Sequence, residues 1–440
     1  MEGLAKRIFE VFDYVLLVCV LILVSLGISF IYSSGVDSDG ILVTNEYIKQ
    51  IIWASIGLVF LIFFAFIDYK KFEKYIVWIY LGLVLVLIYT KFFGRYVNGA
   101  RSWIGLGEFG IQPSEFGKII YILMLAHYLA ISENEQPFKR FVIATGIFVI
   151  VVGLILLQPD LGTASAYIPM YFLMCFLAGV KPKYLGYVFL IGFFSILFTV
   201  LPVWNTYIAK NRFFAINALS NAKIKLIMIF ATSMITLIGI VFRRYFHGPK
   251  YFFWISYGFS IIAISLAFSF ATSKVLKEYQ IQRLIVFLDP SIDPRGYGWN
   301  IIQSKIAIGS GGVFGRSFLN GTQSHYRFLP EQSTDFIFSI YSEEMGFAGG
   351  MLVFLLYFII MVRILYIIKH TANKFGLYIA AGILAMFMIH FFINIGMVMG
   401  IMPITGIPLL FMSYGGSSLL MAMTSIGILM SIKYRKFNFS

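Results

Sequence analysis

Hydrophobic residues along this chain are gathered into long runs that polar segments separate. Most runs hold roughly 16–22 residues with few charges, about the length of α-helix that crosses a ~30 Å hydrocarbon layer. Two runs are shorter, so we expect their helices to begin inside the adjoining loops. The twelve predicted spans are Tyr14–Ser33, Ile51–Ile67, Tyr75–Tyr89, Ile119–Ile131, Phe141–Leu157, Thr163–Ala178, Tyr184–Val203, Ile224–Phe242, Phe252–Thr272, Phe347–Ile368, Leu377–Met399 and Ser413–Ile432.

The composition agrees with this pattern and excludes a water-soluble globule. Of the 440 residues, 60% are hydrophobic and 12% are charged, against roughly 45–50% and about 25% in soluble domains. Because lipid offers no hydrogen-bond partner to open backbone, we predict an all-α, polytopic integral membrane helical bundle of about 12 transmembrane helices, forming one domain over residues 1–440. Cys19 and Cys175 lie inside apolar runs. We expect them to be buried thiols rather than parts of a disulfide or a metal site.

The placement of charge predicts which way the bundle faces. The chain has 34 Lys and Arg and 20 Asp and Glu, a net charge of +14. With the N-terminus placed in the cytoplasm, 18 basic and seven acidic residues fall inside, while 16 basic and 13 acidic residues fall outside. Basic residues favour the cytoplasmic side of membrane proteins. We therefore expect a membrane protein with both termini in the cytoplasm and its long polar loops outside.

Two of the outer segments, Lys91–Lys118 and Ser273–Gly346, are long. Long connections in compact folds are usually functional or disordered, whereas loops that only join helices are short. Both segments mix Gly, Trp, Pro and charged residues with apolar ones. We expect them to fold back onto the bundle, with 273–346 as a large extracytoplasmic loop.

Five segments in and around these loops resemble the signature motifs of a known family. They are NGARSWIGLGEFGIQPSEFGK (Asn98–Lys118), LQPDLGT (Leu157–Thr163), DPRGYGWNIIQSKIAIGSGG (Asp293–Gly312), GTQSHYRFLPEQSTDFIF (Gly321–Phe338) and NIGMVMGIMPITGIPLLFMSYGGSSLL (Asn394–Leu420). In this order they resemble the motifs of the SEDS family, the shape, elongation, division and sporulation proteins. The GTQS before FLPEQ is more similar to the rod-elongation branch than to the division branch.

The resemblance implies a peptidoglycan glycosyltransferase that polymerises lipid II at the outer face of the cytoplasmic membrane, during cell-wall elongation and cell-shape maintenance. It implies a class B penicillin-binding protein, a transpeptidase, as partner within the elongation machinery; we expect no nucleic-acid partner. It also implies a divalent cation, Mg²⁺ or Mn²⁺, although the sequence contains no ligand cluster that demands one. Such a reaction needs a base for the acceptor's 4-hydroxyl and positive charge for the leaving pyrophosphate.

Asp293 is the predicted catalytic residue. It is the acid of the DPRGYG segment, which matches the essential aspartate of the family motif, and the resemblance gives it the role of general base. The 273–346 loop is then the catalytic loop. The alternative is that Asp-Pro simply opens a turn. Asp289 belongs to a second Asp-Pro pair and is equally turn-like, so we assign it no catalytic role.

Glu115 and Lys118 form a second candidate group, for substrate binding. They lie three residues apart just after Pro113, which is favoured in a first helical turn, so both point to one side at the outer mouth of the fourth helix. On a solvated helix such a pair contributes little, but ionisable residues at a membrane boundary are more often functional. The positions match the family's Q-P-S-E-x-x-K motif, which favours a role for Lys118 on phosphate or in holding Glu115.

Two further substrate-binding candidates lie nearby. Arg101 of NGARSW carries a guanidinium that binds phosphate oxygens bidentately, whereas Trp103 beside it suits an interfacial anchor. Asp160 of QPDLG lies between two apolar runs. It is expected to cap or orient the sixth helix from its first turn, as a structural acid paired with a basic group, or else to take part in the chemistry.

The last candidates lie in LPEQSTDF and SYGG. Glu331 has no evident structural role and is kept as a substrate-binding candidate. Ser333 or Thr334 is expected to cap a helix that has Asp335 in its first turn. Ser413 follows PITGIP, which interrupts an apolar stretch. Such breaks are tolerated where the backbone lines a cavity, so we expect SYGG in the wall of the substrate cavity, unless GIPLL is only a re-entrant hairpin.

His325 and His390 stand alone, one in a loop and one in an apolar run. For isolated histidines we expect polar packing rather than metal ligation.

The helix count departs from the family pattern, since family members usually have ten transmembrane helices and the apolar runs predict twelve. The surplus falls between the sixth helix and YQIQRLIVFLDP, so we predict a two-helix insertion at 184–242. An even insertion keeps Asp293 on the outer side.

Other functions remain open on the sequence alone. A flippase or transporter for lipid II would also be a many-helix bundle, but it predicts polar residues near helix midpoints and an inverted repeat, and neither is clear. A structural scaffold would not need Asp293 in its motif. A division or sporulation member of the family is the remaining alternative.

Overall fold

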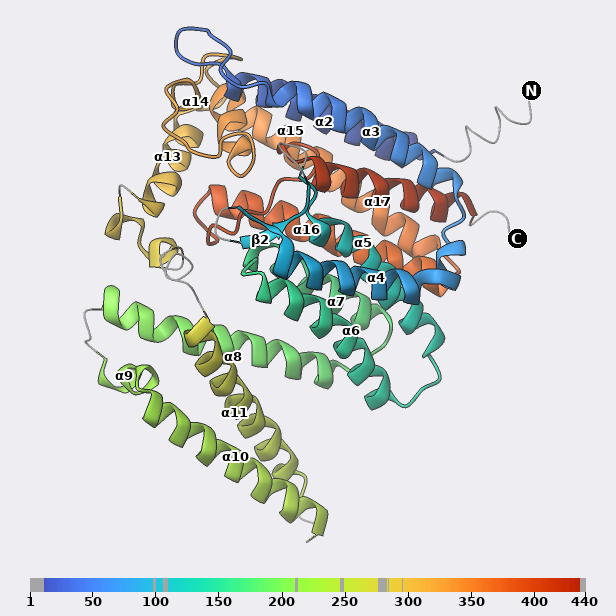
Figure 1. Ribbon diagram of the computed structural model, residues 1–440, viewed down its shortest axis with the longest axis vertical. Coiled ribbons are helices and arrows are strands. Elements are labelled where there is room, and N and C mark those ends of the chain that lie inside the picture. Colours follow the sequence, from blue (N-terminus) through green and yellow to red (C-terminus); the bar gives the residue numbers. More distant parts are fainter. Residues whose placement is uncertain are drawn as a thin grey trace. The chain divides into compact units, whose positions relative to one another are not determined.

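The computed structural model describes residues 12–97, 100–105, 110–209, 213–245, 249–275, 283, 285–294 and 296–435. The chain divides into two compact units, each of which is described by itself. Unit 1 comprises Met1–Val180 with Asn300–Ser440, and unit 2 comprises Lys181–Trp299. Both are built from helices (Figure 1).

Unit 1 is built almost entirely from helices. Its helices are α2 (Tyr14–Gly35), α3 (Glu46–Phe66), α4 (Lys71–Phe93), α5 (Pro113–Ile131), α6 (Pro137–Leu157), α7 (Leu161–Leu177), α14 (Thr322–His325), α15 (Ile337–His370), α16 (Lys374–Val398) and α17 (Gly416–Arg435). Between α4 and α5 the chain forms an antiparallel pair of short strands, β1 (Arg95–Val97) and β2 (Ala100–Trp103). This short pair leaves the predicted all-α class unchanged.

Unit 2 consists mainly of three long helices. Its elements are α8 (Pro182–Tyr207), α9 (Phe214–Ser220), α10 (Ala222–Tyr245), α11 (Tyr251–Val275) and the 3-10 helix η1 (Pro290–Ile292). Helix α13 (Tyr297–Ser310) runs from this unit into unit 1. Helix α11 packs against both α8 and α10.

Eleven of the described helices are long and apolar enough to cross a membrane. Helix α7 is apolar but has only 17 residues. Each of the predicted apolar runs falls on one of these helices, so the chain is a multi-pass helical membrane protein, as predicted. The exact number of spans and the insertion at 184–242 stay predictions. Both cysteines are free and buried, as expected.

Helices α16 and α17 form the interior of unit 1. In their most apolar windows 72% and 89% of the residues are buried. Helix α17 approaches α3 closely at two glycines. A Cβ at Gly427 would lie 2.5 Å from the Leu61 carbonyl oxygen, and a Cβ at Gly416 would lie 2.4 Å from the Trp53 ring. Larger residues there would push the two helices apart.

A buried acid ties three helices together at the end of unit 1 where α2 begins. Asp13 caps α2, with Leu16 N donating to its Oδ1 at 3.2 Å. Arg363 of α15 donates to Asp13 Oδ2 at 2.6 Å, and Lys433 Nζ of α17 lies 3.1 Å from the same oxygen. Further ion pairs among the described residues of unit 1 include Asp68–Arg435, Glu133–Lys374 and Glu135–Lys139.

Helix α15 is broken at Gly346, whose φ of 66° is not helical. The segment after α13 passes through the break, with Arg316 N donating to the Glu343 carbonyl oxygen at 3.1 Å and Phe347 N donating to Gly312 O at 2.9 Å. The side chains of Glu343 and Glu344 are fully buried there. They accept hydrogen bonds from the segment and from α2: from Gln323 N (3.0 Å), Leu319 N (3.0 Å) and Ser33 Oγ (2.5 Å). The break therefore anchors the long segment to the bundle.

Candidate active site

The start of helix α5 holds a buried ion pair. Pro113 and Glu115 lie in the first turn of α5, and Lys118, one turn after Glu115, faces the same side as Glu115, as predicted. Both are buried instead of lying on a solvated surface, with exposed fractions of 4% and 1%. Lys118 Nζ donates to Glu115 Oε1 at 2.5 Å. A buried pair of this kind is strongly coupled, because removal of either partner leaves an uncompensated charge.

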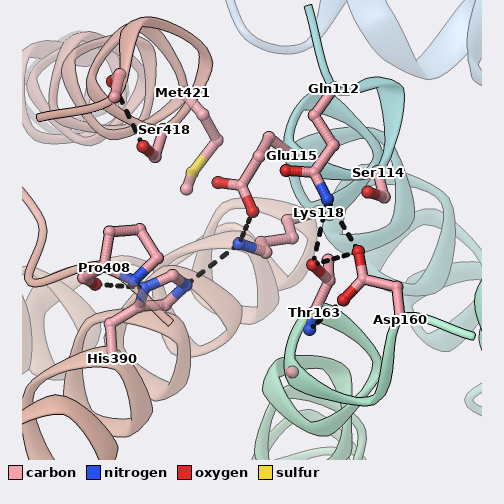
Figure 2. A network of polar contacts seen from close by, with 12 residues as sticks. Gln112, Ser114, Glu115, Lys118, Asp160, Thr163, His390, Pro408, Ser418 and Met421 are labelled. Atoms are coloured by element: carbon pink, nitrogen blue, oxygen red, sulfur yellow. Dashed lines mark hydrogen bonds and ion pairs between the residues drawn. The ribbon is translucent and has the colours of Figure 1, made fainter. Parts of the chain in front are cut away.

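His390 of α16 completes this group. Lys118 Nζ lies 3.0 Å from His390 Nε2, and His390 Nδ1 lies 3.0 Å from the Pro408 carbonyl oxygen (Figure 2). Because a carbonyl oxygen only accepts, Nδ1 carries the proton and neutral Nε2 accepts from Lys118. The expectation that His390 packs among polar groups is confirmed. The sequence did not indicate that one of its partners would be the buried Lys118. The feature of the sequence that could have pointed to this contact is the presence of a polar residue inside an apolar helix.

Asp160 lies beside this group and caps helix α7. Its Oδ1 accepts from Thr163 N at 3.0 Å, and its Oδ2 accepts from Thr163 Oγ1 at 2.8 Å and from Gln112 Nε2 at 2.7 Å (Figure 2). The predicted capping role is confirmed. These donors are neutral, and they tie α7 to Gln112, the residue that precedes α5. A Cβ at Gly162 would lie 2.2 Å from Thr405 O, so the cap also meets the PITGIP segment.

Several buried polar atoms in this part of unit 1 have no hydrogen-bond partner within the described chain. They are Ser114 Oγ, Glu115 Oε2, Asn394 Oδ1 and Thr405 Oγ1. Such atoms are rare in folded proteins and usually mark a place for water, an ion or a ligand. Asn394 donates to the carbonyl oxygens of Asp335 (3.0 Å) and Ile407 (2.9 Å) with its other polar atom. The region therefore has both charge and open hydrogen-bonding capacity.

Ser413 has a structural role in the turn before α17. Its Oγ accepts from Leu409 N at 2.9 Å, and its carbonyl oxygen accepts from Gln50 Nε2 at 3.1 Å. Gln50 Oε1 also accepts from Gly415 N at 3.3 Å. Sequence reasoning missed Gln50, a fully buried residue of α3 that holds SYGG in place. Whether Ser413 binds substrate stays a prediction.

Arg101 and Glu331 are both exposed. Arg101 Nη1 donates to the Phe92 carbonyl oxygen at 3.3 Å. Glu331 has a φ of 50° and accepts from Thr334 Oγ1 at 3.3 Å, so it does have a structural role, in a turn. Their substrate-binding roles stay predictions.

The predicted helix cap at Ser333 or Thr334 is wrong. Helix α15 begins at Ile337 after Phe336, without a side-chain cap, so Asp335 precedes the helix. The Thr334 hydroxyl is bound to Glu331 instead.

Asp293 lies in unit 2, half-buried at the end of η1. Its Oδ1 accepts from Gly296 N at 2.9 Å, and its carbonyl oxygen accepts from Gly298 N at 3.0 Å. A Cβ at Gly296 would lie 2.1 Å from Asp293 Oδ2, and a Cβ at Gly298 would lie 2.3 Å from Pro290 O. The two glycines of DPRGYG thus let the backbone close around the carboxylate. A turn is present, as the alternative interpretation predicts, and it fixes the carboxylate in place.

Asp289 caps η1 and is a turn residue. Its Oδ1 accepts from Ser291 N at 3.0 Å and from Ser291 Oγ at 2.6 Å. These hydrogen bonds hold the pKa of Asp289 below its ordinary value. The side chain is accounted for by the turn alone.

The fold and these groups define a multi-pass membrane protein with buried acid and base groups at its helix ends. A family model described as cell cycle proteins, of FtsW, RodA and SpoVE, matches residues 13–225 and 222–438. The chain belongs to this family.

Curated relatives and a solved structure match along nearly the whole chain. The chain is 51% identical over 428 residues to the peptidoglycan glycosyltransferase RodA of Treponema pallidum, covering 97% of this chain and 98% of that one. It is 31% identical over 378 residues to the peptidoglycan glycosyltransferase MrdB of Escherichia coli K12, covering 86% and 83%. A chain of a peptidoglycan synthase complex, described as coordinating polymerization and crosslinking, has the same fold, with a TM-score of 0.67 at 23% identity over 97% and 98% of the two chains.

Proposed function

We propose that this protein is a peptidoglycan glycosyltransferase of cell elongation and that its substrate is lipid II. The observation that carries the function is the 51% identity with RodA of Treponema pallidum over almost the full length of both chains. The buried Glu115–Lys118 pair and the fixed Asp293 carboxylate supply groups of the kind that this reaction needs.

In the proposed reaction Asp293 accepts the proton of the acceptor sugar's 4-hydroxyl. The hydroxyl oxygen attacks the anomeric carbon of the donor, the new glycosidic bond forms, and the bond to the lipid pyrophosphate breaks. The pyrophosphate leaves with the electron pair and needs positive charge nearby. Arg101 is exposed and is the proposed phosphate ligand. Lys118 is buried between Glu115 and His390, so we assign it the role of positioning these two side chains.

A divalent cation stays part of the proposal. Among the residues that the structure describes, no three His, Cys, Asp or Glu side chains gather as metal ligands. Mg²⁺ is commonly held by one or two carboxylates together with substrate phosphates. Such binding does not require three protein ligands, so the carboxylates of the described chain permit it. When bound, Mg²⁺ or Mn²⁺ would neutralise pyrophosphate charge.

The location and the partner are part of the same proposal. The distribution of basic residues supports cytoplasmic termini and an active site on the outer face. The synthase complex, described as coordinating polymerization and crosslinking, supports a class B penicillin-binding protein as partner in the elongation machinery.

The test is glycan synthesis by the purified full chain with a class B penicillin-binding protein and lipid II. Because a general base contributes about 10²–10⁴-fold, Asp293→Asn is expected to lower the polymerisation rate by about 10²-fold or more. Asp289→Asn is the matched control and should keep the rate. Undiminished glycan synthesis by Asp293→Asn would sink the general-base assignment. Movement of lipid II across vesicles by a wild-type protein that makes no polymer would favour the flippase.

A further inference from the structure

Unit 2 carries most of the net charge of the protein. Residues 181–299 contain thirteen Lys and Arg but three Asp and Glu, which amounts to ten of the fourteen net positive charges. Between Asp160 and Glu278 the sequence has no acidic residue at all. The cations at the start of α8, the end of α10 and the start of α11 therefore have no carboxylate nearby along the chain.

Two of these cations, from different helices, share one aromatic ring. Lys183 Nζ of α8 lies 5.8 Å from the centre of the Phe253 ring, and Arg243 Cζ of α10 lies 4.9 Å from it. Tyr257 of α11 donates to the Lys183 carbonyl oxygen at 2.7 Å and fixes the start of α8 against α11. We call Lys183, Arg243, Arg244 and Lys250, together with Phe253, the cation cluster.

The cation cluster is exposed and has aromatic neighbours of the interfacial type. All four of its basic side chains are exposed. Tyr245, Tyr251 and Trp254 on the same helix ends are 71%, 55% and 62% exposed. Aromatic residues with an apolar body and a polar tip gather where a membrane meets water, at the depth of the lipid headgroups. The cluster thus has the composition of a site at headgroup level.

Within the part of the chain that the structure describes, no acidic side chain pairs with the cation cluster. Throughout the described chain, none of the ion pairs includes a residue of the cation cluster, whereas Lys139, Lys374 and Arg435 of unit 1 are each paired with an acid. Two cations held on one ring repel each other, and an anion between them turns that repulsion into attraction. Orientation of the chain in the membrane needs basic residues in loops, but it does not need two of them on the same ring.

We propose that the cation cluster binds the phosphate of an anionic phospholipid headgroup. The Arg243 guanidinium offers bidentate hydrogen bonds to phosphate oxygens, and Lys183 adds a second charge near the same Phe253 ring. Basic pockets between transmembrane helices commonly bind anionic lipid headgroups in this way. The site lies within unit 2 and does not depend on the proposed glycosyltransferase activity.

The experiment measures lipid binding to the full chain in detergent micelles by native mass spectrometry, with phosphatidylglycerol or phosphatidylcholine added. Each cation near an anionic lipid surface contributes about fivefold to affinity. The double variant Lys183→Gln/Arg243→Gln is therefore expected to bind phosphatidylglycerol about 25-fold more weakly, with no change for phosphatidylcholine. The matched control, Lys139→Gln/Lys374→Gln, removes two cations that are already paired with acids and should bind as the wild type does.

Three outcomes would overturn the proposal. The double variant could bind phosphatidylglycerol as tightly as the wild type, the control could lose as much affinity, or inorganic phosphate alone could compete as well as the lipid does. A variant that fails to fold would elute early in size exclusion. Two further measurements then decide: Arg243→Lys keeps the charge and should lose less than Arg243→Gln, and high salt should weaken wild-type binding.

Discussion

The two units differ in the burial and the pairing of their charged side chains. Unit 1 buries charged groups and pairs them, as in Glu115–Lys118 and in Asp13 with Arg363 and Lys433. Unit 2 leaves the cation cluster exposed, and the most apolar windows of α8 and α10 are 0% and 11% buried. Buried pairs fix the positions of helices because breaking one is expensive, while exposed cations are available to groups outside the protein. Substitutions of these charged residues should therefore lower stability more in unit 1 than in unit 2.

The largest effect is expected from Lys118→Met. It leaves Glu115 buried without its cation, which destabilises proteins by about 3–5 kcal/mol. The midpoint of thermal unfolding in detergent should fall steeply, and Glu115→Gln/Lys118→Met should recover part of the loss. Lys139→Met, which breaks an exposed pair of the same unit, should shift the midpoint little. Equal midpoints for Lys118→Met and Lys139→Met would contradict the view that the buried pair of α5 stabilises the fold more than an exposed pair does.

An intermediate effect is expected at Asp13 and depends on pH. Burial raises the pKa of Asp13, but hydrogen bonds from Arg363, Lys433 and Leu16 N outweigh burial and leave it below its ordinary value. A lowered pKa stabilises the folded state above the unfolded value of about 3.9, and this contribution is lost as pH falls through the folded pKa.

Asp13→Asn should accordingly lower stability near neutral pH by about 2 kcal/mol, the scale of hydrogen bonds to a charged group. The difference from the wild type should shrink below about pH 4. Thermal midpoints of both proteins over a pH series provide the measurement. A constant difference at every pH would show that the charge of Asp13 is not what stabilises this end of the bundle.

The smallest effect is expected in unit 2. In detergent without anionic lipid, Lys183→Gln/Arg243→Gln should change stability by no more than about 1 kcal/mol, because these exposed cations have no acidic partner among the described residues and lose only their contacts with the Phe253 ring. Addition of phosphatidylglycerol should then raise the thermal midpoint of the wild type more than that of the variant. A large destabilisation in the absence of lipid would place these cations in the packing of unit 2 and erase the contrast between the units.

The sequence predicted what depends on local spacing. Apolar runs of membrane length became helices, the three-residue spacing of Glu115 and Lys118 became an ion pair, and Asp160 became a helix cap. It failed where a partner is remote in sequence. His390 is 272 positions from Lys118, and Gln50 is 363 positions from Ser413. No periodicity of one helix reports such contacts, because they depend on how helices pack.

The wrong cap at Thr334 has a similar cause. A Ser or Thr before an apolar run satisfies the usual signal for a helix start. Here Glu331 takes a left-handed conformation, its turn captures the Thr334 hydroxyl, and the helix starts later, at Ile337. A competing local hydrogen bond was available to the same side chain, and the sequence alone does not rank the two.

The break of α15 at Gly346 also bears on how the protein is made. The helix after the break, to His370, is long enough to span a bilayer alone. The part before it contains Glu343 and Glu344, whose carboxylates are bound by groups of α2 and of the preceding segment. Carboxylates without such partners enter lipid at a high cost. Insertion of this chain is thus expected in two stages. The part of α15 after Gly346 enters the membrane first, and the acidic part before Gly346 folds onto α2 afterwards.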